Sequence, residues 1–320
     1  MVSRETLTRG RILRFGRFGV PLQLVCARVD AQRAGLAEAL SPASAGRDWI
    51  FNMKKMLHST IGLGAILAIV FLNSCTTVPE TGRSQLMLIS PSQEAQLGVT
   101  SFQKMKQEVP ISKDRAANAL VQKVGRRIAA VASLPNAKWE FVVFDSKEVN
   151  AFCLPGGKVG VYTGILPVTV NEGGLATVLA HEIAHAAAHH GGERMSEALA
   201  IQGVGQALGA GISDPRWQQA FALGYGVGST VGVALPHSRK QESEADQIGL
   251  LYMARAGYNP EEAIRFWERF KDYNLRTGRD EGWTLLRTHP VDDDRIKALQ
   301  AQLPTAMQEY RAHRRISGTR

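Results

Sequence analysis

Apolar residues recur at helical spacing over most of the chain after residue 91, and this pattern predicts a mostly helical protein. The predicted helices cover residues 92–109, 114–132, 174–190, 238–256, 260–274 and 292–314. The second of them has the clearest apolar face, formed by Leu120, Val121, Val124, Ile128 and Val131. We expect Ser92 to cap the first helix, Gly191-Gly192 to end the third, and Pro304 to break the last.

Two short segments have the composition of strands. Residues 139–144 are rich in β-forming residues, and residues 158–163 alternate in polarity after the turn at 155–157. We therefore predict one α+β domain over residues 92–320, predominantly helical, with a small β-sheet. A Gly- and Ala-rich stretch at 203–232 is expected to form two closely packed helices, since neither half reaches the roughly 20 residues of a membrane span.

The N-terminal part of the chain differs from the rest. Residues 1–52 are Arg- and Ala-rich without sustained periodicity, so we expect a non-native over-extension or a disordered leader. Residues 53–74 begin with Met53-Lys54-Lys55 and continue into the apolar run 61–72, which is the layout of a secretory signal peptide. The polar stretch 75–91 is expected to be a tether.

The run Leu72-Asn73-Ser74-Cys75 resembles the bacterial lipobox, in which cleavage precedes a cysteine that carries lipid. Asn73 departs from the usual residues of that motif, and the alternative is an uncleaved N-terminal anchor. By the same resemblance, Thr76 after the cysteine favours the outer membrane. We expect a protein that is lipid-anchored through Cys75 in the bacterial cell envelope and faces the periplasm. Cys153 is then a lone thiol, so no disulfide framework is available.

The overall composition is that of an ordinary globular protein, with 320 residues of which 44% are apolar and 21% are charged. The net charge is +9, but residues 1–55 supply +6 of it, from ten Lys and Arg against four Asp and Glu. The remaining +3 does not argue for nucleic acid, and the chain has no nucleic-acid-binding motif. We expect no nucleic-acid partner.

The run His181-Glu182-Ile183-Ala184-His185 carries the clearest chemistry in the chain. On a helix, His181 and His185 lie one turn apart on one face, so both imidazoles can reach one ion. Glu182 lies about 100° round the helix, close to the ion but off the ligand face. That position suits a general base for a metal-bound water, whose pKa zinc lowers towards about 7. The motif predicts a zinc site.

A catalytic zinc needs a third protein ligand and an open position. His189 and His190 are candidates, but three ligands in a row on one straight helix surround an ion poorly. Another class of zinc peptidase has a third histidine six residues after His185, and here that position is Gly191. We therefore expect a carboxylate on a second helix.

The segment 238–256 supplies such a carboxylate. Glu242 and Asp246 are four apart and share a helix face, so Glu242 can bind zinc while Asp246 fixes the outer nitrogen of a zinc-binding histidine. Glu244 lies on another face and is expected to be solvated.

The chain is similar to the zinc metallopeptidases of peptidase family M48, a gluzincin group that includes the CAAX prenyl proteases, the HtpX-type membrane proteases and the mitochondrial Oma-type protease. The resemblance covers about 90–305, and residues 190–196 are most similar to the soluble Oma-like, periplasmic branch. Four blocks carry it, at 150–157, 181–185, 238–246 and 288–290.

The resemblance implies a role for each block. His181, His185 and Glu242 would hold one zinc ion per chain, with Glu182 as base. Residues 150–157 would lead into an edge strand that pairs with the substrate backbone. The residues concerned are Asn150, Ala151, Gly156 and Gly157.

Two further residues of the resembling blocks need an interpretation. We read Cys153 as a packing residue rather than a nucleophile. His289 would lie near the metal, where it stabilises the oxyanion or closes the open zinc position as a self-inhibiting ligand. The alternative for His289 is a capping residue before Pro290.

These features predict a zinc metalloendopeptidase that cleaves misfolded or assembling envelope proteins. The alternative is a periplasmic lipoprotein that acts as a chaperone or assembly factor, with a regulated or latent zinc site. The intact Glu182 favours catalysis, because a glutamine there would have removed the base.

Overall fold

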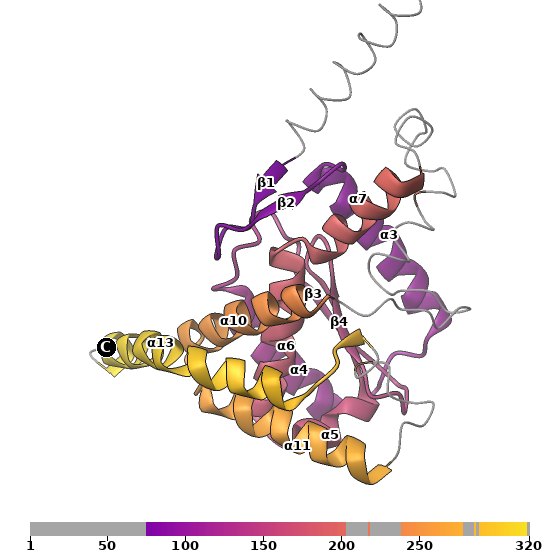
Figure 1. The fold of residues 1–320 in the computed structure, drawn as a ribbon. Coiled ribbons are helices and arrows are strands. Elements are labelled where there is room, and N and C mark those ends of the chain that lie inside the picture. The colour runs from indigo at the N-terminus through magenta and orange to yellow at the C-terminus, as the bar shows by residue number, and fades with distance from the viewer. Residues whose placement is uncertain (1–74, 203–216, 218–237, 278–284, 286–287, 319–320) are drawn as a thin grey trace, which may run out of the picture. The chain divides into compact units, whose positions relative to one another are not determined.

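The computed structural model describes residues 75–202, 217, 238–277, 285 and 288–318. All of them belong to one compact unit, Phe71–Arg320 (Figure 1). The expectations for the leader and the signal peptide lie outside the described residues, as do those for the Gly- and Ala-rich stretch apart from Trp217. Among the residues described, no helix combines the length and the apolar character that a membrane crossing needs.

Helices form most of the described chain, and the predicted α+β fold class is confirmed. The helices are α3 (Pro91–Glu108), α4 (Arg115–Ala129), α5 (Leu166–Thr169), α6 (Glu172–Ala187), α7 (His190–Gln202), α10 (Arg239–Arg255), α11 (Glu261–Thr277) and α13 (Asp293–Gly318). A short 3-10 turn, η1 (Thr163–Ile165), precedes α5.

The strands form two small sheets. In the larger one the order is β3 (Glu140–Phe144), β5 (Lys158–Tyr162), β4 (Ala151–Leu154), so β5 is central. β5 runs parallel to β3 and antiparallel to β4. The smaller sheet is an antiparallel hairpin of β1 (Cys75–Thr77) and β2 (Ser84–Leu86).

Both faces of the larger sheet are buried. Alternate residues of each strand point to opposite sides, so every strand contributes to both faces. One side carries an aromatic cluster with α3, whose members are Phe102, Phe144, Phe152 and Tyr162. The other side carries small apolar residues that pack with α4 and α6; they include Val143, Ala151, Cys153 and Val161. This double burial explains why the strands are nearly continuous apolar runs in the sequence.

Helix α6 lies at the centre of the fold and packs against α4, α10, α11 and β4. It begins at Asn171, whose side chain accepts a hydrogen bond from the backbone N–H of Gly174 at 2.8 Å. Every residue from Gly174 to Ala187 is buried, as expected of a helix that is apolar all round. Helix α10 approaches α6 closely at Gly249, where a Cβ would lie 3.3 Å from the backbone nitrogen of His181. This contact sets how α10 presents its side chains to α6.

The predicted helix ends are wrong at three places. Ser90, not Ser92, caps α3; its side chain accepts from Gln93, and Pro91 takes the first helical position, where no N–H is needed. Helix α6 ends at Ala187 because the backbone turns sharply at His189, where φ is +54°. The two glycines expected to end it therefore lie in α7.

Pro304 does not break the last helix but lies inside α13. Proline in a helix interior costs about 3 kcal/mol. Helix α13 packs along α10 and α11, and this packing holds it together across the proline.

Candidate metal centre

His181 and His185 lie one turn apart on α6, on the side of the helix that α10 covers. Their Nε2 atoms are 3.1 Å apart. Both side chains are buried, at 2% and 5% exposure, so water cannot satisfy their ring nitrogens. They need partners within the protein or a bound cation.

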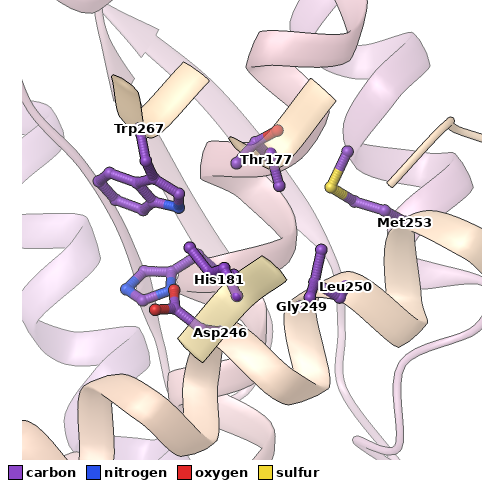
Figure 2. A pocket seen from close by; sticks show the side chains of 9 residues that line it. Thr177, His181, Asp246, Gly249, Leu250, Met253 and Trp267 are labelled. Atoms are coloured by element: carbon purple, nitrogen blue, oxygen red, sulfur yellow. The ribbon is translucent and has the colours of Figure 1, made fainter. Parts of the chain in front are cut away.

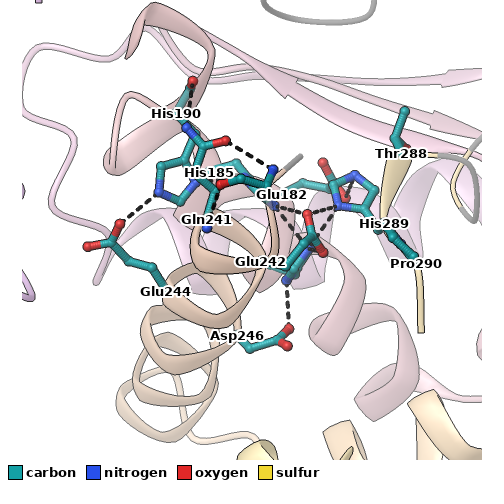
Figure 3. A network of polar contacts seen from close by, with 12 residues as sticks. Glu182, His185, His190, Gln241, Glu242, Glu244, Asp246, Thr288, His289 and Pro290 are labelled. Carbon is teal, nitrogen blue, oxygen red and sulfur yellow. Dashed lines mark hydrogen bonds and ion pairs between the residues drawn. The ribbon is translucent and has the colours of Figure 1, made fainter. Parts of the chain in front are cut away.

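Glu242 on α10 reaches the same point. Its carboxylate oxygens lie 3.5 Å from Nε2 of His181 and 3.3 Å from Nε2 of His185. His289 comes from the segment before α13, and its Nδ1 is 3.1 Å from Nε2 of His181 and 2.8 Å from Oε1 of Glu242 (Figure 3). Each of these four buried residues offers one possible metal-ligand atom, and these four atoms lie within 4.8 Å of one another.

The four donors fit zinc. Two imidazoles and a carboxylate form a common ligand set of catalytic zinc sites. Tetrahedral bonds of about 2.0–2.1 Å place neighbouring donors roughly 3.3 Å apart. The spacings between His181, His185 and Glu242 are 3.1–3.5 Å, so little movement is required to hold an ion.

Glu182 lies beside this cluster and is also buried. Its Oε1 makes no hydrogen bond within the described residues, and Nε2 of His289 is 3.5 Å away. Burial raises the pKa of Glu182 above its usual range. A carboxylate with an unused oxygen and a raised pKa next to metal donors can accept a proton from a water molecule held there.

The side chain of His289 lies in the cluster, which contradicts the alternative of a capping residue before Pro290. Its backbone N–H donates to the carbonyl of Leu285 at 2.8 Å, and the Thr288 hydroxyl donates to the same carbonyl at 3.1 Å. The local turn contacts thus use the Thr288 hydroxyl and the backbone of His289, while the His289 side chain points at the donors.

Asp246 lies one turn after Glu242 and its Oδ1 is 3.0 Å from Nδ1 of His181. Arg295 from α13 holds Asp246 with two nearly parallel hydrogen bonds of 2.7 and 2.8 Å, and its Nη1 lies 2.8 Å from Glu242. The guanidinium also stacks over Trp267, 4.1 Å from the ring centroid. No spacing rule points to Arg295, since its partners lie on another helix.

A small cavity lies on the other side of His181 and Asp246. Thr177, Gly249, Leu250, Met253 and Trp267 contribute to its wall (Figure 2). The cavity is therefore bounded mostly by apolar groups behind the metal donors.

Glu244 was expected to be solvated, and this is wrong: it is 7% exposed. It accepts hydrogen bonds from His190 and Arg83, because the N-terminal hairpin covers this face of α10.

His190 is not expected to be the third ligand, and it lies next to the cluster, with Nδ1 2.8 Å from Nδ1 of His185. His189 points elsewhere and pairs with Glu94 at 2.6 Å.

The residues expected to bind substrate lie at the start of β4 and in the turn that follows it. Ala151 begins β4, one of the two edge strands of the larger described sheet, and Asn150 precedes it. Gly156 and Gly157 form the β4–β5 turn, both with positive φ, and face Ala95 and the 137–139 segment. Cys153 is buried in β4 on the α6 side; burial, and then the charge of Glu182, raise the pKa of its thiol, as suits a packing residue.

The charge states of the donors follow from their surroundings. Burial lowers the pKa of His185 well below its usual range. For Glu242, burial acts against ionisation, but His289, Arg295 and the neighbouring histidines hold the pKa well below its usual range. His181 differs: burial opposes its protonation, yet hydrogen bonds to Asp246 and Glu242 raise its pKa to about 9.

Two histidines and a glutamate placed to hold one metal, with a buried carboxylate beside them, form the arrangement of a zinc metallopeptidase. Comparison with known families agrees: Peptidase family M48 matches residues 115–303. The chain belongs to this family. The predicted class of zinc metalloendopeptidase and the zinc cofactor are thereby confirmed.

The individual relatives match this chain over only part of their own length. The chain is 38% identical to the mitochondrial metalloendopeptidase OMA1 of Schizosaccharomyces pombe over 58% of this chain and 53% of that protein. It is 30% identical to the mitochondrial metalloendopeptidase OMA1 of Danio rerio over 82% of this chain and 57% of that protein. It is 27% identical to the beta-barrel assembly-enhancing protease of Escherichia coli (strain K12) over 77% of this chain and 50% of that protein. The chain thus spans about half the length of these curated relatives.

The pKa of His181 predicts that zinc binding releases a proton. Near pH 7.5 the metal-free site holds a proton on His181, whose pKa is about 9, and zinc must displace it. Zinc affinity should therefore rise by about tenfold per pH unit up to pH ~9 and then level off. Titration calorimetry in buffers of different ionisation enthalpy should report about one proton released.

The Asp246→Asn variant is the control for this prediction. It removes a hydrogen bond that raises the pKa of His181, so fewer protons should be released. A zinc affinity that is independent of pH between about 6 and 8 would contradict the prediction.

Proposed function

We propose that this chain is a zinc-dependent endopeptidase with His181, His185 and Glu242 as zinc ligands and Glu182 as general base. The observation that carries the proposal is the position of Oε1 of Glu182, which is buried without a hydrogen bond among the described residues and lies beside three donors at zinc spacing. Its contact with Nε2 of His289 is 3.5 Å long, and burying a carboxylate oxygen without a hydrogen bond is unfavourable, so a role in the chemistry of the site accounts for it.

The residues of the chain divide the chemistry between them. When bound, zinc polarises the scissile carbonyl and lowers the pKa of a water towards about 7. Glu182 takes the proton of that water and passes it to the leaving amine. Asp246 holds the ring of His181 through Nδ1, so that Nε2 faces the metal.

His289 is proposed to occupy the fourth position of the metal until a substrate displaces it. Its Nδ1 lies as close to His181 as His185 does, 3.1 Å in both cases, which supports a ligand role in the resting state. After displacement the imidazole would still be near Glu182, whose Oε1 is 3.5 Å from Nε2 of His289, and could stabilise an oxyanion. Such a site would be latent, which favours the second candidate function, a periplasmic lipoprotein that acts as a chaperone or assembly factor with a regulated or latent zinc site.

The substrate is proposed to be an extended polypeptide that pairs with β4. In the described part of the chain β4 pairs with β5 alone, and it packs on the helix that carries His181 and His185. Asn150 and Ala151 lie where such a chain would begin to pair, while Gly156 and Gly157 shape the far turn. Main-chain pairing carries the affinity, so the enzyme would tolerate many sequences.

Misfolded or assembling proteins of the bacterial envelope are the proposed substrates. The name of the Escherichia coli relative refers to β-barrel assembly, and the names of the other relatives refer to mitochondria. The N-terminal features of this chain favour the first setting, with a signal peptide at 53–74 and a lipid on Cys75.

The Glu182→Gln variant should lower the rate of casein cleavage by about 10²–10⁴-fold while zinc content is unchanged, because the amide cannot accept the proton. Glu197→Gln changes an exposed glutamate of α7 and should cleave like the unchanged protein. Equal cleavage by the two variants would refute the proposed base, and absence of zinc from the unchanged protein would refute the site.

The His289→Ala variant should cleave casein several times faster than the unchanged protein, because the fourth zinc position is open from the start. The measurement is the initial rate with zinc content determined in parallel. Thr288→Ala, which removes the hydroxyl contact with Leu285 and leaves the His289 side chain in place, is the control for disturbance of this segment. Slower cleavage with zinc retained would instead assign His289 to the oxyanion.

The Cys75→Ser variant should move from the membrane fraction to the soluble fraction of bacterial cells if lipid on Cys75 anchors the chain. Metabolic labelling with a fatty acid should be lost at the same time. Cys153→Ser keeps Cys75 and should stay in the membrane fraction. Unchanged fractionation of Cys75→Ser would support the uncleaved N-terminal anchor.

A further inference from the structure

A line of buried polar contacts runs from one metal donor to the N-terminal hairpin. His190 lies between His185 and Glu244 (Figure 3), and Glu244 in turn contacts Thr81 and Arg83 in the turn that joins β1 and β2. These residues are neither the proposed base nor proposed zinc ligands. They call for a separate explanation.

The first part of the line fixes the histidine rings. Nδ1 of His190 is 2.8 Å from Nδ1 of His185, and Nε2 of His190 is 2.9 Å from Oε2 of Glu244. If His185 holds zinc through Nε2, its Nδ1 carries a hydrogen and must donate. His190 then accepts at Nδ1 and donates from Nε2 to the carboxylate, so each ring has one usable tautomer.

The second part of the line fixes the carboxylate. Nε of Arg83 lies 2.5 Å from Oε2 of Glu244, and the two Nη atoms of Arg83 hold Glu193 at 2.6 and 2.8 Å. The Thr81 hydroxyl donates to the other oxygen of Glu244. His190 is fully buried and Glu244 nearly so, which makes each contact costly to lose.

From this geometry we infer that His190 and Glu244 are positioning residues for the zinc ligand His185, and that Arg83 makes the N-terminal hairpin part of the metal site. The inference rests on the proposed function, because it takes His185 as a zinc ligand. A carboxylate normally holds a zinc-binding imidazole directly, as Asp246 does for His181. On the His185 side a second imidazole is interposed, and this extends the support as far as the hairpin.

The same hairpin offers a matched comparison. Glu80 lies in the same turn and, like Glu244, accepts hydrogen bonds from an arginine and a hydroxyl group, in this case Arg255 and Ser133. These contacts also dock the turn on the domain, but they do not lead to a metal donor. Glu80→Gln therefore loosens the hairpin without touching the line to His185.

The experiment compares zinc affinity of Glu244→Gln, Arg83→Gln and Glu80→Gln in the full chain, extracted in detergent. Zinc dissociation constants are measured by competition with a chromogenic chelator, and circular dichroism checks the fold. We expect Glu244→Gln to weaken zinc binding about 10–100-fold and Arg83→Gln to weaken it less, in the same direction. Glu80→Gln should bind zinc like the unchanged protein. Arg83→Gln, at the outer end of the line, decides the question if Glu244→Gln does not fold.

The outcomes separate this inference from the proposed function. His185→Ala must lose zinc if His185 is a ligand, and retention there would refute the ligand assignment itself. Normal zinc affinity in both Glu244→Gln and Arg83→Gln, with His185→Ala defective, would overturn the inference alone. Equal weakening by Glu80→Gln would also overturn it, since hairpin docking in general would then be responsible.

Discussion

The packing of α10 on α6 is the contact on which the metal centre depends. Two histidines on α6 give an ion only two donors, and the third donor, Glu242, arrives because α10 comes close at Gly249. Asp246 lies on the same face of α10 and holds His181 from behind. A helix pair that sat farther apart would leave the carboxylates of α10 out of reach, whatever the rest of the fold did.

Bringing these groups together buries a concentration of negative charge. Glu182, Glu242 and Asp246 lie within the protein, where an uncompensated ion costs several kcal/mol. The positive charge of Arg295 offsets part of this negative charge. Its guanidinium donates two hydrogen bonds to Asp246 and also contacts Glu242. In the metal-free site a proton on His181 adds positive charge, and a divalent cation at the donors would take over that part when it displaces the proton. Helix α13, which carries Arg295, is thus a component of the site.

The sequence predicts the groups whose relation is local. His181, His185 and the Glu242–Asp246 pair were found because helical spacing alone puts each pair on one face, and the structure brings them together. Arg295 escaped prediction, because its partners belong to a different helix. Glu244 was assigned to the wrong environment for a related reason: a helix face is exposed or buried according to what covers it. Residues 75–86 were expected to form part of a tether. They fold instead into the hairpin that covers the face of α10 on which Glu244 lies.

The double burial of β4 has a consequence for how the protein would choose its substrates. With aromatic rings on one side and α6 on the other, the side chains of β4 have little surface left with which to read another chain. What remains is a backbone edge of four residues, about 13 Å long. A polypeptide pairing there must free a stretch of that length from its own hydrogen bonds. The rate of cleavage would then depend on how often a segment of the substrate unfolds locally, and stably folded proteins would be cleaved slowly.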